Sequence, residues 1–301
     1  MTIAITYRWV DRPDTAAARD LLSEASNSDG VDAFSEAFVL GLTDARLHHR
    51  HVAAEAEGQL VGLAAVAGTD AELVVAPGWR GKGIGRGLLA EVRAAVPEVG
   101  VWAHGDLPAA QALAARLSLR PRRTLLVMRL GERELAAADS DVPEGFRVLN
   151  LAEAAQRWGR DAIEQAWLTV NNDAFSWHPE QGGWDRDRLH RAQEASWFRD
   201  EDVLFLIHGG DDAALSVAGF HWVKVAAPGE AEVYVVGLAS AFRGRGLGGP
   251  LVGMGLTHMR SRGARSVILY VEADNEAAVR RYESVGFVVA ERHVVYRATM
   301  E

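Results

Sequence analysis

The chain contains no cysteine among its 301 residues. Disulfide bonds, thiolate zinc sites and cysteine nucleophiles are therefore excluded from its chemistry. The lack of cysteine also agrees with a cytoplasmic protein, and this is the compartment that we expect. The ten histidines are scattered and form no H-E-x-x-H pair, so the sequence predicts no metal site.

Long apolar runs and an excess of basic residues are also missing. No apolar stretch approaches the roughly 18 residues that a membrane span needs. The first residues, MTIAITYRWVDRPDTAA, contain no basic segment followed by an apolar one, so we expect no signal peptide. The net charge of −9 argues against a nucleic-acid surface, which needs a basic patch. The composition thus predicts a soluble globular protein that binds neither membrane nor nucleic acid.

One glycine-rich motif, R-x-x-G-x-G, occurs twice, each time after a strand-like run. The copies are RGKGIG at residues 80–85 and RGRGLG at residues 243–248, and both open an apolar helical pattern. Glycines that turn a strand into a helix N-terminus allow backbone N–H groups to approach and bind an anion. We therefore expect a duplicated domain, each half of which can hold a pyrophosphate.

The expected elements follow a similar order on either side of residues 131–145, an acidic segment with a proline that predicts a linker. The fold class expected is α+β, with two tandem domains at residues 1–138 and 146–301, each a mixed, mostly antiparallel sheet flanked by helices. In the first half we expect strands at 2–9, 51–57, 60–68, 72–75, 100–104 and 124–130, with helices at 14–27, 87–95 and 109–117. In the second half we expect strands at 146–150, 203–208, 216–225, 233–238, 266–272 and 288–299, with helices at 151–171, 251–262 and 276–285.

Near-constant spacing supports the duplication. Arg80 and Arg243 are 163 residues apart, and the similar segments 114–119 and 282–287 are 168 residues apart. The alternative is two unrelated domains whose glycine loops agree by chance. The repeated element order favours duplication.

The second glycine loop, followed by NEAAVRRYESVGF at residues 275–287, resembles the GNAT superfamily of acyl-CoA-dependent N-acyltransferases. The first half keeps the loop but departs from the pattern after it. Over nearly its full length the chain also resembles the mycothiol synthase family of tandem GNAT acetyltransferases. This resemblance is carried by NNDAFSWHPEQGGW at residues 171–184, GFHWVK at 219–224, EVYVVG at 232–237, LYVEADN at 269–275 and VWAHG at 101–105.

The resemblance implies transfer of an acetyl group from acetyl-CoA to the cysteinyl amine of cysteinyl-glucosaminyl-inositol, a small thiol pseudodisaccharide. No metal is implied, and we expect a monomer. Acceptor contacts are implied for Glu36, Glu180, Lys224, Glu232 and Tyr270. The implied acetyl-CoA contacts are Leu73, Val74, Val75, Gly81, Lys82, Gly83, Ile84, Gly85 and Arg86 in the first half, and Val236, Gly237, Leu238, Arg243, Gly244, Arg245, Gly246, Leu247, Gly248, Gly249, Asn275, Glu276, Ala277, Ala278, Val279 and Arg280 in the second.

Acetyl transfer to an amine requires removal of a proton from the ammonium, donors for the thioester oxygen, and a proton for the departing thiolate. The resemblance assigns Glu232 as the general base and Tyr282 as the general acid. A solvated strand glutamate and a core-packing tyrosine are the alternatives for these two residues. The oxyanion donor is expected among the backbone N–H groups near Gly237, which predicts a bulge or splay in that strand.

The internal alignment predicts that only the second half is catalytic. Counting back from the loop arginines, Glu232 corresponds to Thr69, and Tyr282 corresponds to Ala114. Neither Thr69 nor Ala114 can exchange a proton at neutral pH. Glu72 is a possible substitute base, but an odd shift along a strand places its side chain on the other face.

Three other functions stay open at this point. The first is a tandem GNAT enzyme for another amine, such as an aminoglycoside or a peptide N-terminus. The second is a non-catalytic acyl-CoA-binding protein, which the presence of both Glu232 and Tyr282 disfavours. A nucleotide-binding Rossmann domain is more distant, because the loop of the first half, GKGIGR at residues 81–86, lacks G-x-G-x-x-G.

Overall fold

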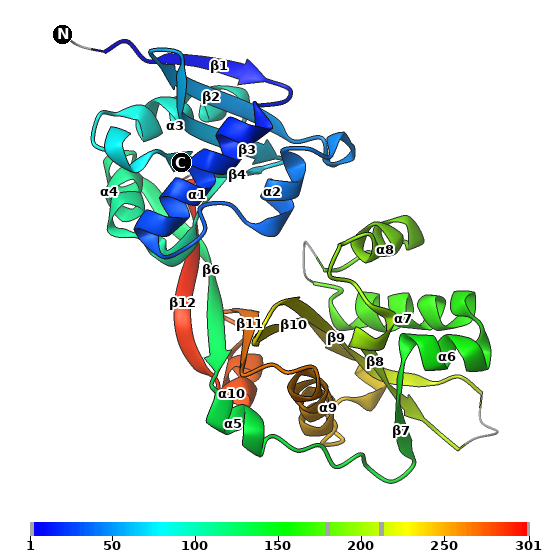
Figure 1. Ribbon diagram of the computed structural model, residues 1–301. Coiled ribbons are helices and arrows are strands. Elements are labelled where there is room, and N and C mark those ends of the chain that lie inside the picture. Colours follow the sequence, from blue (N-terminus) through cyan, green and yellow to red (C-terminus); the bar gives the residue numbers. More distant parts are fainter. Residues whose placement is uncertain (1–2, 178–180, 211–213, 300–301) are drawn as a thin grey trace. The chain divides into compact units, whose positions relative to one another are not determined.

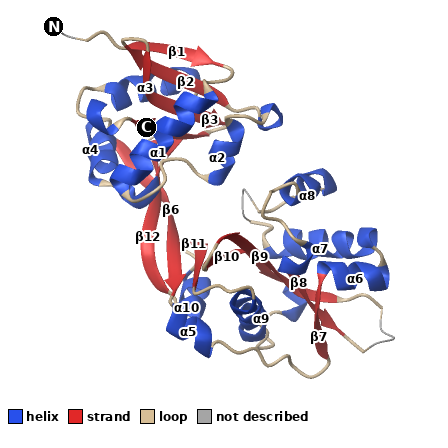
Figure 2. Cartoon of the chain, viewed as in Figure 1, coloured by secondary structure: helices blue, strands red, loops and turns tan. Residues whose placement is uncertain are grey.

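The computed structural model describes residues 3–177, 181–210 and 214–299 (Figure 1). The chain forms two compact units that interlace in sequence. Unit 1 contains Met1–Leu126, Glu272–Asp274 and Glu291–Glu301, and unit 2 contains Val127–Val271 and Asn275–Ala290. Each unit has a mixed sheet with helices packed against it (Figure 2), so the expected α+β class is confirmed.

The sheet of unit 1 is antiparallel except at one pair of strands. Its order is β1-β2-β3-β4-β5-β12, with β4 and β5 parallel. The strands are β1 (Thr6–Val10), β2 (Arg50–Ala56), β3 (Gln59–Ala67), β4 (Asp70–Val75), β5 (Gly100–Ala103) and β12 (Val288–Ala298), and the helices are α1 (Thr15–Asp29), α2 (Glu36–Gly41), α3 (Ile84–Ala95) and α4 (Pro108–Arg116).

Two apolar layers cover this sheet. On one face, α1 and α2 pack Leu21 and Phe38 against Leu63 and Val74 of the strands. On the other face, the buried stripe of α3 packs against β2 and β3. Both β3 and β4 contribute side chains to each layer, because successive residues of a strand point to opposite faces. The stripe of α3 consists of Ile84, Leu88, Leu89 and Val92.

Unit 2 repeats this plan. Its sheet order is β6-β11-β10-β9-β8-β7, with β10 and β11 parallel. Helices α6 and α7 pack on one face and α9 on the other. The strands are β6 (Leu119–Leu130), β7 (Phe146–Asn150), β8 (Val203–His208), β9 (Val217–Ala227), β10 (Glu230–Leu238) and β11 (Ser266–Glu272), and the helices are α5 (Glu132–Ala137), α6 (Leu151–Trp158), α7 (Arg160–Ala174), α8 (Arg186–Gln193), α9 (Gly248–Ser261) and α10 (Glu276–Val285).

The last strand of each unit comes from the other half of the chain. In unit 1, β5 pairs with the C-terminal part of β12, where Val295 lies opposite Trp102. In unit 2, the C-terminal part of β6 lies beside β11. A single cut in the sequence therefore does not separate the two units.

Some helices differ from those expected. The expected linker at 131–145 contains α5, and the single helix expected at 151–171 is two helices, α6 and α7. They meet at Gly159, which has a φ of +87° and caps the start of α7. Glycine adopts that conformation without the steric cost that other residues meet. Helices α2 and α8 were not expected.

A buried histidine on β9 predicts pH-dependent stability of unit 2. His221 is fully buried, and its Nδ1–H donates to the carbonyl oxygen of Leu251 at 3.0 Å. Burial lowers the pKa of His221 from 6.5 to about 4. Because the unfolded chain binds this proton more readily, the contribution is fully present above pH 6.5 and is lost as pH falls to about 4.

We expect the unfolding free energy of unit 2 to fall by about 3 kcal/mol over this interval through His221 alone. Urea unfolding followed by tryptophan fluorescence at several pH values measures the change. In the His221→Gln variant, which keeps a donor for Leu251 but cannot take the proton, the slope should be smaller. An unchanged slope in that variant would assign the pH dependence to other groups.

Candidate active site

Three of the implied acceptor residues share one face of the unit 2 sheet. Glu232 on β10 is paired with Lys224 on β9 and with Ile268 on β11. Directly opposite residues on neighbouring strands point to the same face, and so do residues two apart on one strand. Tyr270, two residues after Ile268, therefore lies on the face that carries Lys224 and Glu232. The strand register alone brings these three side chains together.

Glu232 lies in a partly buried, aromatic environment. Its Oε2 is 3.4 Å from Nζ of Lys224, and the two side chains are 15% and 16% exposed. The same ammonium lies 5.3 Å from the ring centroid of Trp197 and 5.7 Å from that of Tyr234. An ion pair and two cation–π contacts hold Lys224, so the carboxylate of Glu232 has a fixed partner on one side.

The parallel strands of unit 2 separate beside this face. The pairing between β10 and β11 ends with Val233 and Leu269, whereas β10 continues to Leu238 in register with β9. Within the described residues, the edge of β10 from 234 to 238 has no pairing with β11. Strand β4 separates from β5 in the same way after Ala71. Such an opening exposes backbone N–H groups at the carboxyl end of a strand.

The expected bulge or splay at Gly237 is present as a splay, since β10 is no longer paired with β11 at this residue, whereas a bulge of the strand lies earlier, at Tyr234. The register with β9 shifts between Val233 and Val235, and Gly237 is regularly paired with Phe220. A Cβ atom on Gly237 would lie 2.7 Å from the Phe220 ring, so this glycine is required by close packing. The bulge turns the Tyr234 ring onto two tryptophans, with centroids 4.7 Å from Trp197 and 4.9 Å from Trp222.

The bulge changes the alignment of the two units. The β3–β4 hairpin has an unbroken register, whereas the β9–β10 register shifts between Glu230 and Glu232 and again between Val233 and Val235, and the second shift places one extra residue in β10. Asp70 pairs with Ala67 at the position where Glu232 pairs with Lys224, so these counterparts are 162 residues apart. The expected counterpart, Thr69, is wrong by one residue and lies in the turn before β4.

The corrected alignment also changes the face of the sheet that is assigned to the side chain of Glu72. It lies two residues after Asp70, so its side chain is on the same face as the counterpart of Glu232. The expectation of the opposite face is wrong because it was counted from Thr69. Asp70 accepts a hydrogen bond from Arg297 at 3.0 Å. Glu72 is 2% exposed, and the residue at its position in the β9–β10 hairpin is Val235.

Both glycine loops have the same backbone shape. The φ angles are +77° at Gly81 and +86° at Gly83, and +74° at Gly244 and +77° at Gly246. A Cβ at any of these four positions would meet no atom within 4 Å, so the loops are open beside their glycines. The positive φ angles explain why the motif needs glycine at these positions.

A cation–π pair supports each loop. The ammonium of Lys82 lies 4.2 Å from the centroid of Trp79, and the guanidinium of Arg245 lies 5.1 Å from that of Phe242. The two cations are 163 residues apart in the sequence, and so are the two aromatic residues. The bulge lies before the second loop. From the loops onward, the expected correspondence of residues 163 apart is therefore unchanged. The duplication therefore extends to side-chain contacts.

The first arginine of each loop is bound by the protein itself. Arg80 makes two hydrogen bonds to Asp29 at 2.7 and 2.8 Å, which raise the pKa of Arg80. Arg243 donates to the carbonyl oxygen of Ala174 at 3.3 Å. Asp173, next to it at the end of α7, accepts from the N–H of Ser240. These contacts anchor the start of each loop.

Helix α10 carries the expected acid. Asn275 caps the helix, because its side chain accepts the N–H of Ala278 at 3.3 Å. Tyr282 is partly buried, and desolvation raises the pKa of its hydroxyl to about 12. Helices α4 and α10 begin 168 residues apart. Ala114 of α4 therefore has the position in its helix that Tyr282 has in α10.

The remaining expected residues lie elsewhere. Glu36 is the first residue of α2 in unit 1 and is exposed. Glu180 lies outside the described residues. Within residues 3–177, 181–210 and 214–299, no group of three or more histidines and carboxylates could hold a metal ion. The same part of the chain holds no helix with the length and apolar character of a membrane span.

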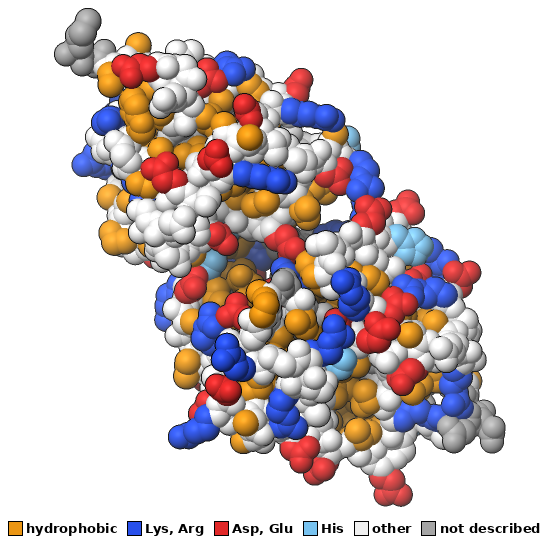
Figure 3. Space-filling view, viewed as in Figure 1, with side chains coloured by type: hydrophobic (Ala, Val, Ile, Leu, Met, Phe, Trp, Pro, Cys, Tyr) orange, Lys and Arg blue, Asp and Glu red, His pale blue; other side chains and the backbone are white. Residues whose placement is uncertain are grey.

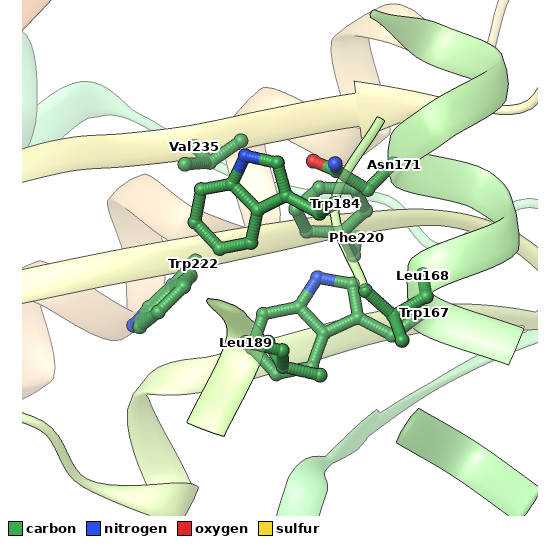
Figure 4. Close-up of a pocket in the computed structure, with 8 residues that line it drawn as sticks. All are labelled: Trp167, Leu168, Asn171, Trp184, Leu189, Phe220, Trp222 and Val235. Atoms are coloured by element: carbon green, nitrogen blue, oxygen red, sulfur yellow. The ribbon is translucent and has the colours of Figure 1, made fainter. Parts of the chain in front are cut away.

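An aromatic core supports the active face of unit 2. Trp184 and residues of α7, α8, β9 and β10 line a cavity of about 10 Å³ (Figure 4). That volume is about that of one water, so the cavity is a gap in the core and not an acceptor site. The rings of Trp167 and Trp222 meet edge to face here, with centroids 5.0 Å apart. The lining residues are Trp167, Leu168, Asn171, Trp184, Leu189, Phe220, Trp222 and Val235.

Trp197, Tyr234 and Asp173 are site residues that the sequence analysis missed. Each acts by supporting an expected residue through a contact between distant segments. Asp173 and Tyr234 lie within the family stretches at 171–184 and 232–237, which was the only signal for them, and Trp197 lies outside every such stretch. On the face that Figure 3 shows, the described residues of each unit mix acidic, basic and apolar side chains without a continuous basic patch.

Solved structures with this fold include a tandem GNAT protein and a GCN5-related N-acetyltransferase. A tandem GNAT protein from the clavulanic acid biosynthesis pathway has a TM-score of 0.72 and 20% identity over 98% of each chain. A GCN5-related N-acetyltransferase from Sphaerobacter thermophilus has a TM-score of 0.70 and 21% identity, with 99% of this chain and 97% of that chain covered. At this identity the likeness shows the fold.

Sequence comparisons identify the family. The acetyltransferase (GNAT) family matches residues 151–287, and an acetyltransferase (GNAT) domain matches residues 47–117. The mycothiol acetyltransferase of Corynebacterium efficiens is 51% identical, with 98% of this chain and 96% of the relative covered. That of Nocardia farcinica is 45% identical, with 98% of each chain covered. The chain belongs to the mycothiol acetyltransferase family of tandem GNAT proteins.

Proposed function

We propose that the chain transfers the acetyl group of acetyl-CoA to the cysteinyl amine of cysteinyl-glucosaminyl-inositol, giving mycothiol and CoA. The observation that carries this proposal is the convergence of Lys224, Glu232 and Tyr270 on one face beside the strand opening. The names of relatives that are about half identical over nearly the full length support the same acceptor. We further propose that the enzyme is a cytoplasmic monomer.

The geometry suits nucleophilic attack by an amine. Glu232 takes a proton from the acceptor ammonium, directly or through one water, and Lys224 and Tyr270 bind acceptor hydroxyl groups. The free amine attacks the thioester carbon, and the C–S bond then breaks. Tyr282 gives its proton to the departing CoA sulfur and is reprotonated by the second proton that the attacking nitrogen loses as the amide forms. Since burial raises the pKa of Tyr282 to about 12, its hydroxyl is protonated throughout the physiological pH range.

The cofactor occupies the strand opening and the glycine loop in this proposal. Backbone N–H groups along Val236–Leu238 bind the pantetheine chain and the thioester oxygen, since that edge of β10 is not paired with β11. The loop from Arg243 to Gly249 wraps the pyrophosphate with its N–H groups. Asn275 and the first turn of α10 provide the second contact.

The first half of the chain lacks the proton-transfer residues and does not catalyse the reaction in this proposal. We propose that the domain formed mainly by residues 1–138 is non-catalytic and the one formed mainly by residues 146–301 is catalytic, each taking its last strand from the other half of the chain. Asp70, the counterpart of Glu232, is held by Arg297, and Ala114 stands where Tyr282 would donate. The loop at Gly81 to Gly85 has the same open shape as its copy, so this half can bind acetyl-CoA without turning it over.

Release of CoA thiol tests the acceptor. The acceptor is cysteinyl-glucosaminyl-inositol blocked at sulfur, so that its own thiol does not react with the detecting reagent. We expect saturable release with this compound and much slower release with an aminoglycoside or a peptide N-terminus. Faster release with either of these would replace the proposed acceptor. Binding of acetyl-CoA without release from any amine would indicate a binding protein.

Replacement of the proposed base should act on turnover. Glu232→Gln keeps the size of the side chain but cannot take the proton, so we expect kcat/KM to fall about 10²–10⁴-fold. Glu230→Gln is the matched control on the same strand, because Glu230 is bound to Arg129. Steady-state kinetics of both variants measure the difference. Equal effects would remove Glu232 from the role of base.

A pair of glycine variants separates the two loops. Gly246→Ala and Gly83→Ala each place a side chain at a positive φ, where a non-glycine residue costs about 1–2 kcal/mol, without creating a clash. We expect Gly246→Ala to lower kcat/KM for acetyl-CoA about tenfold and Gly83→Ala to leave it unchanged. Titration calorimetry reports binding to each loop. If Gly83→Ala reduced turnover as much, both halves would contribute to catalysis.

A further inference from the structure

A cleft lies beside the second glycine loop, within unit 2. It has a volume of about 460 Å³ and lies between α9, α10 and the segment that runs through and beyond α5 (Figure 1). Gly249 and Pro250 line it at the loop, and Leu256 lines it about 10 Å further along α9. All of its lining residues belong to unit 2. A cleft of this size is typical of sites for ligands as large as a nucleotide.

Hydrogen bonds fix the wall that follows α5. Oγ of Ser140 donates to the carbonyl oxygen of Pro250 at 3.2 Å. The guanidinium of Arg260 donates to two backbone carbonyl oxygens of the same segment, each at 2.8 Å. A Cβ atom on Gly253 would lie 2.6 Å from the carbonyl oxygen of Asp139, so the segment crosses α9 at a glycine. The cleft is therefore a defined feature of unit 2.

The cleft combines apolar surface with groups that accept hydrogen bonds. Pro250, Leu256 and Val285 contribute apolar side chains, and the acidic residues Asp139 and Asp141 lie on the wall formed by the segment after α5. An apolar surface receives the face of a purine ring, and a carboxylate accepts hydrogen bonds from an exocyclic amine or a ribose hydroxyl. The lining therefore suits a nucleoside.

Arg281 of α10 brings a positive charge to the loop end of the cleft. The side chain is exposed, and its guanidinium fills the space in which a side chain of Gly249 would begin. Among the described residues, this guanidinium makes no ion pair and no hydrogen bond. The fold of unit 2 therefore does not use the charge of Arg281. A guanidinium matches the geometry of a phosphate, to which it can donate two parallel hydrogen bonds.

The two units carry this charge on different helices. Gly249 corresponds to Arg86 of α3, 163 residues earlier, and Arg281 corresponds to Leu113 of α4, 168 residues earlier. The Leu113 side chain also reaches the start of the preceding helix, since it lies 3.4 Å from the position of a Cβ atom on Gly85. Each unit therefore has one arginine in this pair of positions. An exchange that keeps the charge but not the packing indicates that the charge has a ligand.

We propose that the cleft receives the adenosine end of acetyl-CoA and that Arg281 binds its 3′-phosphate. The inference rests on the proposed function, in which the loop from Arg243 to Gly249 wraps the pyrophosphate. The ribose is joined directly to that pyrophosphate, and Gly249 belongs both to the loop and to the lining of the cleft. Arg281 is then a specificity-determining residue for the phosphorylated form of the cofactor. It takes no part in proton transfer, so its loss should act on KM and not on kcat.

The test compares acetyl-CoA with acetyl-dephospho-CoA, which lacks only the 3′-phosphate. For the parent enzyme we expect a KM about tenfold higher for the dephospho form, with kcat within twofold. Arg281→Leu, which introduces the residue of unit 1, should raise the KM for acetyl-CoA about tenfold and leave that for acetyl-dephospho-CoA unchanged. Arg133→Gln is the control, because it removes a cation of α5 that is 94% exposed, and it should change neither KM. Equal KM values for the two forms in the parent, or equal losses in Arg281→Leu, would overturn the inference.

A rescue variant tests the exchange of the charge between helices. The three atoms nearest to a Cβ on Gly249 all belong to the Arg281 side chain, so Arg281→Leu makes room for a side chain there. Gly249→Arg in the Arg281→Leu background reproduces the pair of unit 1, and we expect it to recover the preference for acetyl-CoA. Thermal unfolding shows whether unit 2 is intact in the double variant. A folded double variant with equal KM values for the two forms would overturn the inference.

Titration calorimetry with CoA and dephospho-CoA separates this inference from the proposed function, because it needs no acceptor. Any binding to unit 1 is the same in the parent and in Arg281→Leu, so their difference reports unit 2. If no amine led to release of CoA, but the parent bound CoA about tenfold more tightly and Arg281→Leu did not, the proposed reaction would be wrong and the inference would stand. If the parent released CoA thiol but bound both forms equally, only the inference would be overturned.

Discussion

The opening between β10 and β11 is the constraint on which the rest of unit 2 depends. Parallel strands hold together by exchanging N–H and C=O bonds, and here that exchange stops after Val233 and Leu269. The edge of β10 that is left without this pairing lies between the face that carries Glu232 and the glycine loop that follows the strand. The proposed positions of the thioester, the base and the pyrophosphate therefore all depend on where the pairing of β10 with β11 ends.

The two units show how one scaffold carries different chemistry. Both have the strand opening, the open glycine loop and a cation–π pair beside it. They differ where protons would move. Unit 2 has a Lys224–Glu232 ion pair. In unit 1, Asp70 corresponds to Glu232 and forms an ion pair with Arg297 of β12. Unit 1 instead keeps a buried carboxylate at the position of Val235, and uses it within its own framework.

Local patterns were sufficient for much of the fold. The alternation of strand residues and the two glycine loops predicted the element order, the α+β class and the duplication. The bulge at Tyr234 was missed, because the mostly apolar stretch EVYVVG gives no local sign of an extra residue. Its position is decided by the Tyr234 ring, which packs against Trp197 and Trp222. Those contacts join three segments, and the shift of one residue then moved the counterpart of Glu232 from Thr69 to Asp70.

The sequence by itself determined the glycine loops, since a positive φ that only glycine adopts cheaply is a property of single residues. It also determined which side chains alternate on each strand. Only the tertiary structure decided that β12 completes unit 1 and β6 completes unit 2, and that His104 meets His293, 189 residues away. Such pairings depend on which sheet edges are free after the local elements have packed. That choice is made by the combined burial and hydrogen bonding of distant segments, and no single stretch of the chain encodes it.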